Sequence, residues 1–152
     1  MTVGSDLRWS GLSLSELAYR IERTEFDIYR RTPQGNHLTE AQFKEYRHNI
    51  PPERQRVIQE VETAWQAVES MGKPIDKPVV IDSAETSEAL QDLKTHALDG
   101  YDVFALRAAL ASGIAQILSD DGDFCVVSGI HLFTANRNVV ATAQSQGRLV
   151  VR

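Results

Sequence analysis

The chain has 152 residues, of which 42% are hydrophobic and 24% charged, and its formal net charge is −5 at pH 7. This length and composition are typical of one globular domain and argue against disorder or a fibrous repeat. The negative charge argues against a passive nucleic-acid coat, which needs many basic side chains on phosphates. An acidic pocket can still act on nucleic acid, because bound metal ions invert its charge.

The expected location is the cytoplasm. No apolar run approaches the roughly 18 residues that cross a bilayer, and the opening MTVGSDLRWSG lacks the basic and then apolar layout of a signal peptide. Cys125 is the single cysteine, which excludes an internal disulfide and fits a reducing compartment. We expect a cytoplasmic protein with no membrane segment.

The first part of the expected single domain, 1–152, is a helical portion over residues 12–77. Residues 7–12 look extended, and Ser13 and Glu16 have the spacing of a capping box before a helix over 14–29. Apolar spacing predicts that this helix buries three residues on one side: Leu17, Ile21 and Ile28.

Two more helices are predicted in the same portion. Thr39 and Gln42 repeat the capping-box spacing before a helix that ends near residue 48. Pro52 suits the first turn of a helix over 51–72, since no amide donor is needed there. An apolar stripe that includes Trp65 and Met71 predicts a core face for this helix.

The second portion, 78–152, alternates strands with helices. Strands are predicted over 78–81, 114–118 and 129–135, and helices over 84–97, 102–112 and 136–147. The first of these helices should point Ala89, Leu90 and Leu93 inward. The alternation predicts an α/β protein with three layers, α/β/α, around a mostly parallel central sheet.

Carboxylates gather where such a fold forms its sites. The stretch LSDDGDF places Asp120, Asp121 and Asp123 directly after a predicted strand, and sites in parallel sheets form beyond the carboxyl ends of strands. Glu16 and Asp102 stand at predicted helix starts, where a negative charge also offsets the helix dipole. Turn formation and dipole compensation are the simpler explanations for each acid alone. Taken together, such carboxylates could hold Mg²⁺ or Mn²⁺.

The run LDGYDVFALRAALASGIAQILSDDGDF…VSGIHLFTAN, residues 98–136, resembles the C-terminal half of a PIN domain, the nuclease fold of many toxin–antitoxin toxins. Asp102 matches the acid that opens a helix in that family. Ser119 matches the hydroxyl position, Asp121 the following acid, and Asp123 the first member of an Asp-Phe pair. Upstream, LSLSELAYRIERTE resembles the family segment with a helix-opening Glu, here Glu16.

The resemblance implies a Mg²⁺- or Mn²⁺-dependent ribonuclease, held in check by an antitoxin protein. The implied catalytic acids are Glu16, Asp102, Asp121 and Asp123, and the implied metal ligands are Glu16, Asp102 and Asp121. Around them, Ser119 would contact a ligand acid or a phosphate, and Asn136 would hydrogen-bond nearby or cap a helix. Three arginines could steer RNA, unless they only cover solvated helix faces: Arg20, Arg23 and Arg107.

The chain also departs from the family pattern. PIN domains begin with a central strand that ends in a ligand acid, and the fifteen residues before Glu16 leave no room for that strand. Asp82 stands too close to Asp102 to be its permuted equivalent, and a helix-capping role suits it better. We therefore expect an N-terminally truncated PIN-like fold, whose exposed strand edges invite pairing with a second copy or with the N-terminal segment.

Two interpretations of this departure stay open. Either the chain is a shortened version of an active nuclease, or it is a catalytically degenerate PIN-like module for protein interaction or dimerisation. Other chemistries find less support in the sequence. The histidines show no zinc-ligand spacing, and Cys125 lies in an apolar run without a nearby histidine.

Overall fold

A computed structural model describes residues 6–75 and 82–150 as a mixed α/β protein with long helices and short parallel strands. The chain forms two compact units, Met1–Pro74 and Ile75–Arg152. The division lies close to the predicted change from the helical pattern to the alternating one. The strand predicted over 78–81 lies outside the described residues.

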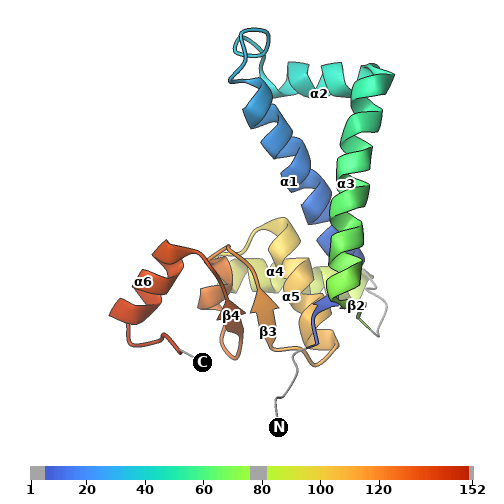
Figure 1. Ribbon diagram of the computed structural model, residues 1–152. Helices are drawn as coiled ribbons and strands as arrows, with labels where there is room; N and C mark the ends of the chain where they lie inside the picture. The colour runs from blue at the N-terminus through green and yellow to red at the C-terminus, as the bar shows by residue number, and fades with distance from the viewer. Residues whose placement is uncertain (1–5, 76–81, 151–152) are drawn as a thin grey trace. The chain divides into compact units, whose positions relative to one another are not determined.

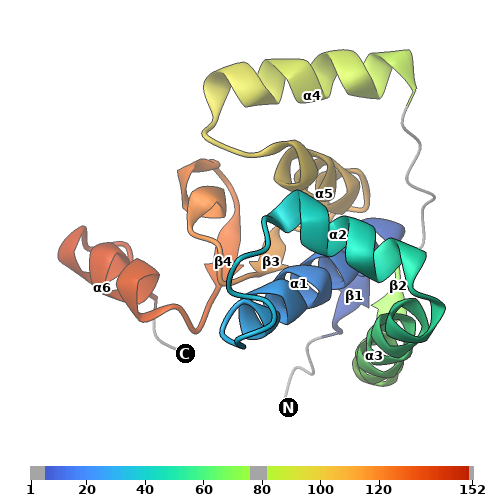
Figure 2. The same ribbon diagram turned by 90° about the horizontal axis from the view of Figure 1, so that it is seen from above.

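The first unit consists of three helices and a short pair of strands. Helix α1 (Gly11–Tyr29) and helix α3 (Pro51–Met71) pack against each other, and α2 (Glu40–Asn49) packs on α3. Figures 1 and 2 show α2 joining the ends of α1 and α3 that lie away from the strands. The strands β1 (Arg8–Trp9) and β2 (Lys73–Pro74) pair in parallel, so the predicted N-terminal extended segment pairs inside its own unit.

The predicted helices of this unit are confirmed, with one correction at the start of α1. The helix begins at Gly11 and not near Leu14, because Ser10 is extended (φ −133°) and its amide donates to Ser13 Oγ at 3.1 Å. Ser13 therefore lies inside the helix, and it does not form the predicted capping box with Glu16. The capping box of Thr39 and Gln42 at α2 is confirmed.

An aromatic cluster forms the core at the α2 end of the first unit. Phe26, Phe43 and Val57 are buried, and the Phe26 and Phe43 ring centroids lie 5.1 Å apart. Near the strands, Trp9 meets Trp65 edge to face at 5.0 Å. Ile28 and Met71 are predicted in the core but are 54% and 64% exposed. Ile28 lies about 200° around the helix from the buried Phe26, and Met71 is the last residue of α3.

The second unit carries the alternating elements in the predicted order. Helices α4 (Ser83–Thr95) and α5 (Gly100–Ala111) precede β3 (Gln116–Leu118), and a short 3₁₀ helix, η1 (Asp123–Val126), leads to β4 (His131–Phe133) and α6 (Arg137–Ser145). The strands β3 and β4 pair in parallel, with Ile117 opposite Leu132, as the alternation predicts. In both views α5 lies on the β3 side of this pair and α6 on the β4 side.

Val103 and Leu106 of α5, 0% and 1% exposed, form the centre of the second core. Helix α4 contributes Ala89 to this core, as predicted, whereas Leu90 and Leu93 are 54% and 39% exposed, contrary to prediction. The helix presents the stripe that contains Ala89 to α5. Leu90 lies about 100° around the helix from Ala89, so both cannot face the same neighbour.

Arg107 joins α4 to α5 through three carboxylates. Its guanidinium binds Glu85 at 2.6 Å and Asp92 at 3.0 Å, and it also contacts Glu88. Glu85 and Asp92 lie on the same stripe of α4 as Ala89, and Glu88 lies beside them on the flank of that stripe. The hydrogen bond to Glu85, with those to Asp92 and Glu88, holds the pKa of Arg107 above its usual value.

Replacing Arg107 with Met should destabilise the second unit by about 1–2 kcal/mol, because the ion pairs are lost and three carboxylates are left to repel one another. Urea unfolding followed by circular dichroism measures the change, and about 1 M NaCl should reduce it by screening. Arg137→Met is the control, since Arg137 is exposed on α6. Equal losses in the two variants would contradict the role given to Arg107.

Candidate metal centre

Asp102 takes its position from the start of α5. The helix begins at Gly100, and Asp99 is its N-cap, whose Oδ1 accepts hydrogen bonds from the amides of Tyr101 at 2.9 Å and Asp102 at 3.1 Å. The sequence pointed to Asp102 as the helix-opening acid, whereas Asp99 performs the capping. Asp102 itself lies half-buried in the first turn of the helix.

A chain of local turns fixes the loop after β3. Ser119 Oγ accepts a hydrogen bond from the amide of Asp121 at 3.0 Å, and Asp121 Oδ1 accepts one from the amide of Asp123 at 3.0 Å. Such side-chain to backbone bonds are the usual way that Ser and Asp stabilise tight turns. A side chain at position 122 would crowd helix α6, since a Cβ there would stand 3.0 Å from Val139 Cγ2.

Asp120 ties this loop to the end of β4. Its Oδ1 accepts hydrogen bonds from Thr134 Oγ1 at 3.2 Å and from the amide of Ala135 at 3.1 Å. Asn136 donates from Nδ2 to the Asp120 carbonyl oxygen at 2.8 Å and caps α6 through Oδ1, which accepts from the amide of Asn138 at 3.0 Å. The capping role expected for Asn136 is confirmed, and Asp120 acts as a structural tie between the two strand ends.

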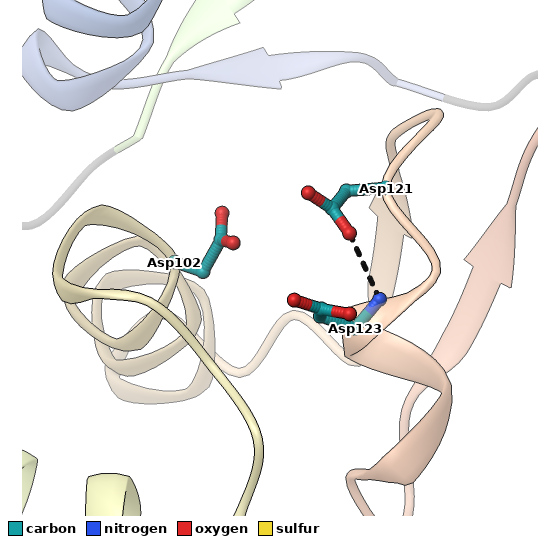
Figure 3. Close-up of side chains that lie close together, drawn as sticks. All are labelled: Asp102, Asp121 and Asp123. Carbon is teal, nitrogen blue, oxygen red and sulfur yellow. Dashed lines mark hydrogen bonds between the residues drawn. The ribbon is translucent and has the colours of Figure 1, made fainter.

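The result is a cluster of three carboxylates within the second unit. Asp102, Asp121 and Asp123 each offer an oxygen atom, and these atoms all lie within 4.8 Å of one another. Figure 3 shows Asp102 reaching from α5 toward the other two, which come from the loop and the start of η1. Asp102 and Asp121 are half-buried and Asp123 is exposed, so the cluster opens to solvent on the Asp123 side.

The dimensions of the cluster suit a hard divalent cation with small adjustments. Mg²⁺ binds oxygen at about 2.0–2.1 Å, so two of its ligands stand at most about 4 Å apart. A separation of up to 4.8 Å therefore requires one carboxylate to turn inward or to bind through a water molecule. The donor set contains only oxygen atoms, which fits Mg²⁺ or Mn²⁺ better than softer metals.

The other predicted acid and the predicted arginines have partners of their own. Glu16 belongs to the first unit, where its Oε1 accepts a hydrogen bond from Arg20 Nε at 2.6 Å, so its part in the metal centre stays a prediction. Arg23 is paired with Glu40 at 2.5 Å, and hydrogen bonding to Glu40 raises the pKa of Arg23. Arg107 is occupied by the three acids of α4.

We did not predict from the sequence that Asp99 caps α5 or that Asp120 binds the end of β4. The sequence does contain a signal for Asp99. An Asp that precedes Gly100 and stands three positions before Asp102 matches a helix N-cap. The contact between Asp120 and Thr134 joins residues from two strand ends, and no local pattern indicates it. The capping of α4 by Asp82 was predicted and is confirmed by the 2.9 Å bond from the Glu85 amide.

Comparisons of this chain with protein-family models, with curated proteins and with solved structures found no match. In the described part of the chain, no helix combines the length and the apolar character needed to cross a membrane. The arguments for function therefore come from the geometry of the second unit.

Replacing Asp120 with Ala should destabilise the protein by about 1 kcal/mol, because the Ala135 amide and the Thr134 hydroxyl lose their acceptor. Asp123→Ala is the matched control, and it should leave stability unchanged or slightly raised, since it removes one of three like charges. Urea unfolding of the two variants measures the difference. An equal loss in both would show that Asp120 is not the tie.

Proposed function

We propose that the chain is a PIN-like, metal-dependent ribonuclease of the toxin type, and that its second unit belongs to a three-layer α/β/α fold. The observation that carries the proposal is the convergence of Asp102 with Asp121 and Asp123 at the carboxyl end of β3. This is the end of a parallel strand where α/β proteins form their sites. Two of the three acids, Asp102 and Asp121, are ligands that the family resemblance implies.

The roles of the residues follow from their positions. Asp102 and Asp121, both half-buried, would hold Mg²⁺ or Mn²⁺, and the exposed Asp123 would orient a water molecule or complete the ligand set. When bound, such an ion lowers the pKa of a coordinated water and offsets the charge that develops on a scissile phosphate. Ser119 supports the site by fixing the Asp121 amide, which sets the direction of the loop.

Electrostatics supports a cation at this position. Three carboxylates in such close contact repel one another, and a divalent cation between them turns this repulsion into attraction. RNA is itself an anion, so a bound cation would favour its approach by reducing the negative charge of the cluster. The proposed substrate is therefore RNA. The family resemblance adds an antitoxin protein as inhibitor, and the proposed location is the cytoplasm.

The test is cleavage of a labelled single-stranded RNA in the presence of Mg²⁺ or Mn²⁺. Cleavage should disappear with EDTA and should fall at least about 100-fold in Asp102→Asn and Asp121→Asn, because each removes a ligand charge. Asp27→Asn is the control, since Asp27 is exposed on α1 in the first unit. Metal affinity measured by calorimetry should fall in the same two variants and stay unchanged in the control.

Glu16→Gln tests whether the first unit contributes a ligand. If Glu16 belongs to the metal centre, its loss should weaken Mn²⁺ binding about tenfold or more. An unchanged affinity would restrict the centre to the three aspartates of the second unit.

The alternative function is a degenerate PIN-like interaction module, and the surface of β3 favours it. Leu118 is 69% exposed, and β4 is the one partner of β3 in the described part of the chain. In this case the protein should form a dimer or bind a partner equally well with Asp102→Asn and Asp121→Asn. Calorimetry should then detect no metal affinity, and RNA should stay intact.

A further inference from the structure

A cavity in the first unit, far along the sequence from the aspartate cluster, combines aromatic walls with a buried cation. It has a volume of about 110 Å³ and lies between α1 and α2. Phe26 and Phe43, both buried, line it together with Tyr19. A cavity of about 150 Å³ can hold a benzene molecule, so this one has room for a small polyatomic group.

Arg47 is the feature of this cavity that calls for a ligand. It is 5% exposed, its Nη1 donates to the Glu22 carbonyl oxygen at 3.0 Å, and its guanidinium lies 5.2 Å from the centre of the Phe43 ring. Among the residues that the structure describes, it forms no ion pair with a carboxylate. Burial lowers the pKa of Arg47, and the charges of Glu22, Glu25 and Glu60 act in the opposite direction without an ion pair to the guanidinium.

A buried guanidinium without a counter-ion is costly, and proteins normally pair such a group with an anion. The two carboxylates that line the cavity are turned to other cations. Glu40 pairs with Arg23 at 2.5 Å, and Glu22 lies 3.6 Å from Arg54. Neither of these two acids therefore forms an ion pair with the Arg47 guanidinium.

The balance of charge indicates what kind of anion fits. The lining includes the cations Arg23, Lys44 and Arg47 and the carboxylates Glu22 and Glu40, which leaves one unit of positive charge with histidine neutral. A monoanion matches this excess. A phosphate dianion would bring a second negative charge close to the two glutamates.

We propose that this cavity binds a single carboxylate group, which accepts hydrogen bonds from the Arg47 guanidinium and the Lys44 ammonium between aromatic walls. The planar fork of arginine suits the two oxygens of a carboxylate, and Lys44 lies one turn of α2 before Arg47, at the exposed rim. The carboxylate belongs to a small free acid or to an acidic side chain of another polypeptide. The proposal is independent of the proposed ribonuclease site.

The experiment is a titration of the full-length protein with sodium acetate at constant ionic strength, followed by the NMR signals of the Arg47 Nε–H group and the α2 amides. The signals should shift to saturation. Arg47→Lys should weaken binding at least about tenfold, because the fork is lost while the charge is kept. Arg31→Gln, an exposed charge change outside the cavity, should leave the affinity unchanged.

A second variant and two further ligands complete the test. Lys44→Gln changes an exposed residue at the rim of the cavity, so it should fold normally even if Arg47→Lys does not. It should weaken acetate binding about threefold or more. Acetate represents a small free acid, and an aspartate residue with blocked amino and carboxyl ends represents an acidic side chain of another polypeptide. Binding of the blocked aspartate shows that the cavity accepts a side chain. Shifts without saturation, equal affinities in all variants, or tighter binding of phosphate than of acetate would overturn the proposal.

Discussion

The second unit holds three carboxylates within 4.8 Å of one another, and their mutual repulsion must be overcome by other contacts in the same unit. Those contacts are mainly hydrogen bonds to the backbone. Asp99 caps α5 and so fixes the turn that carries Asp102, while Ser119 and Asp121 fix the loop after β3. Asp120 then fastens this loop to the end of β4. The cluster is a consequence of how the chain satisfies its turns and helix ends.

Each unit also depends on one arginine that gathers three carboxylates. Arg56 of α3 contacts Glu25 of α1 and two acids of its own helix, at 2.7 Å for Glu60 and 3.4 Å for Glu53. Arg107 of α5 forms ion pairs with carboxylates of α4 in the same way. Arg47 is different, because its guanidinium is buried beside the Phe43 ring and donates to the carbonyl oxygen of Glu22. Arg47 is thus a buried cation that no carboxylate pairs with in the described part of the chain.

Local features of the sequence predicted the elements well. The capping pair at Thr39, the proline start of α3 and the cap at Asn136 all act through hydrogen bonds or backbone restrictions within a few residues. The prediction of buried residues was wrong where packing against a neighbouring helix decides which side chains are buried. Leu90 is as apolar as any core residue, yet the stripe of α4 that faces α5 also carries the acids that bind Arg107, and this turns Leu90 to solvent.

The candidate site was predicted in part for the same reason. The crowding of acids after β3 is visible in the sequence, and the family resemblance pointed to Asp102 and Asp121. Which of the three loop acids turns toward α5 depends on hydrogen bonds across the strands. Asp120 binds Thr134 and Ala135, and only Asp121 and Asp123 are left to face Asp102.

The sequence by itself determined the helices, most of their caps, the parallel pairing of β3 and β4 and the place where negative charge accumulates, because propensity, capping and alternation act over short distances along the chain. Tertiary structure alone decided which apolar residues are buried, which aspartate is spent on holding the loop, and that Arg47 is enclosed without a partner carboxylate. These outcomes depend on contacts between residues distant in sequence, and no spacing rule encodes such contacts.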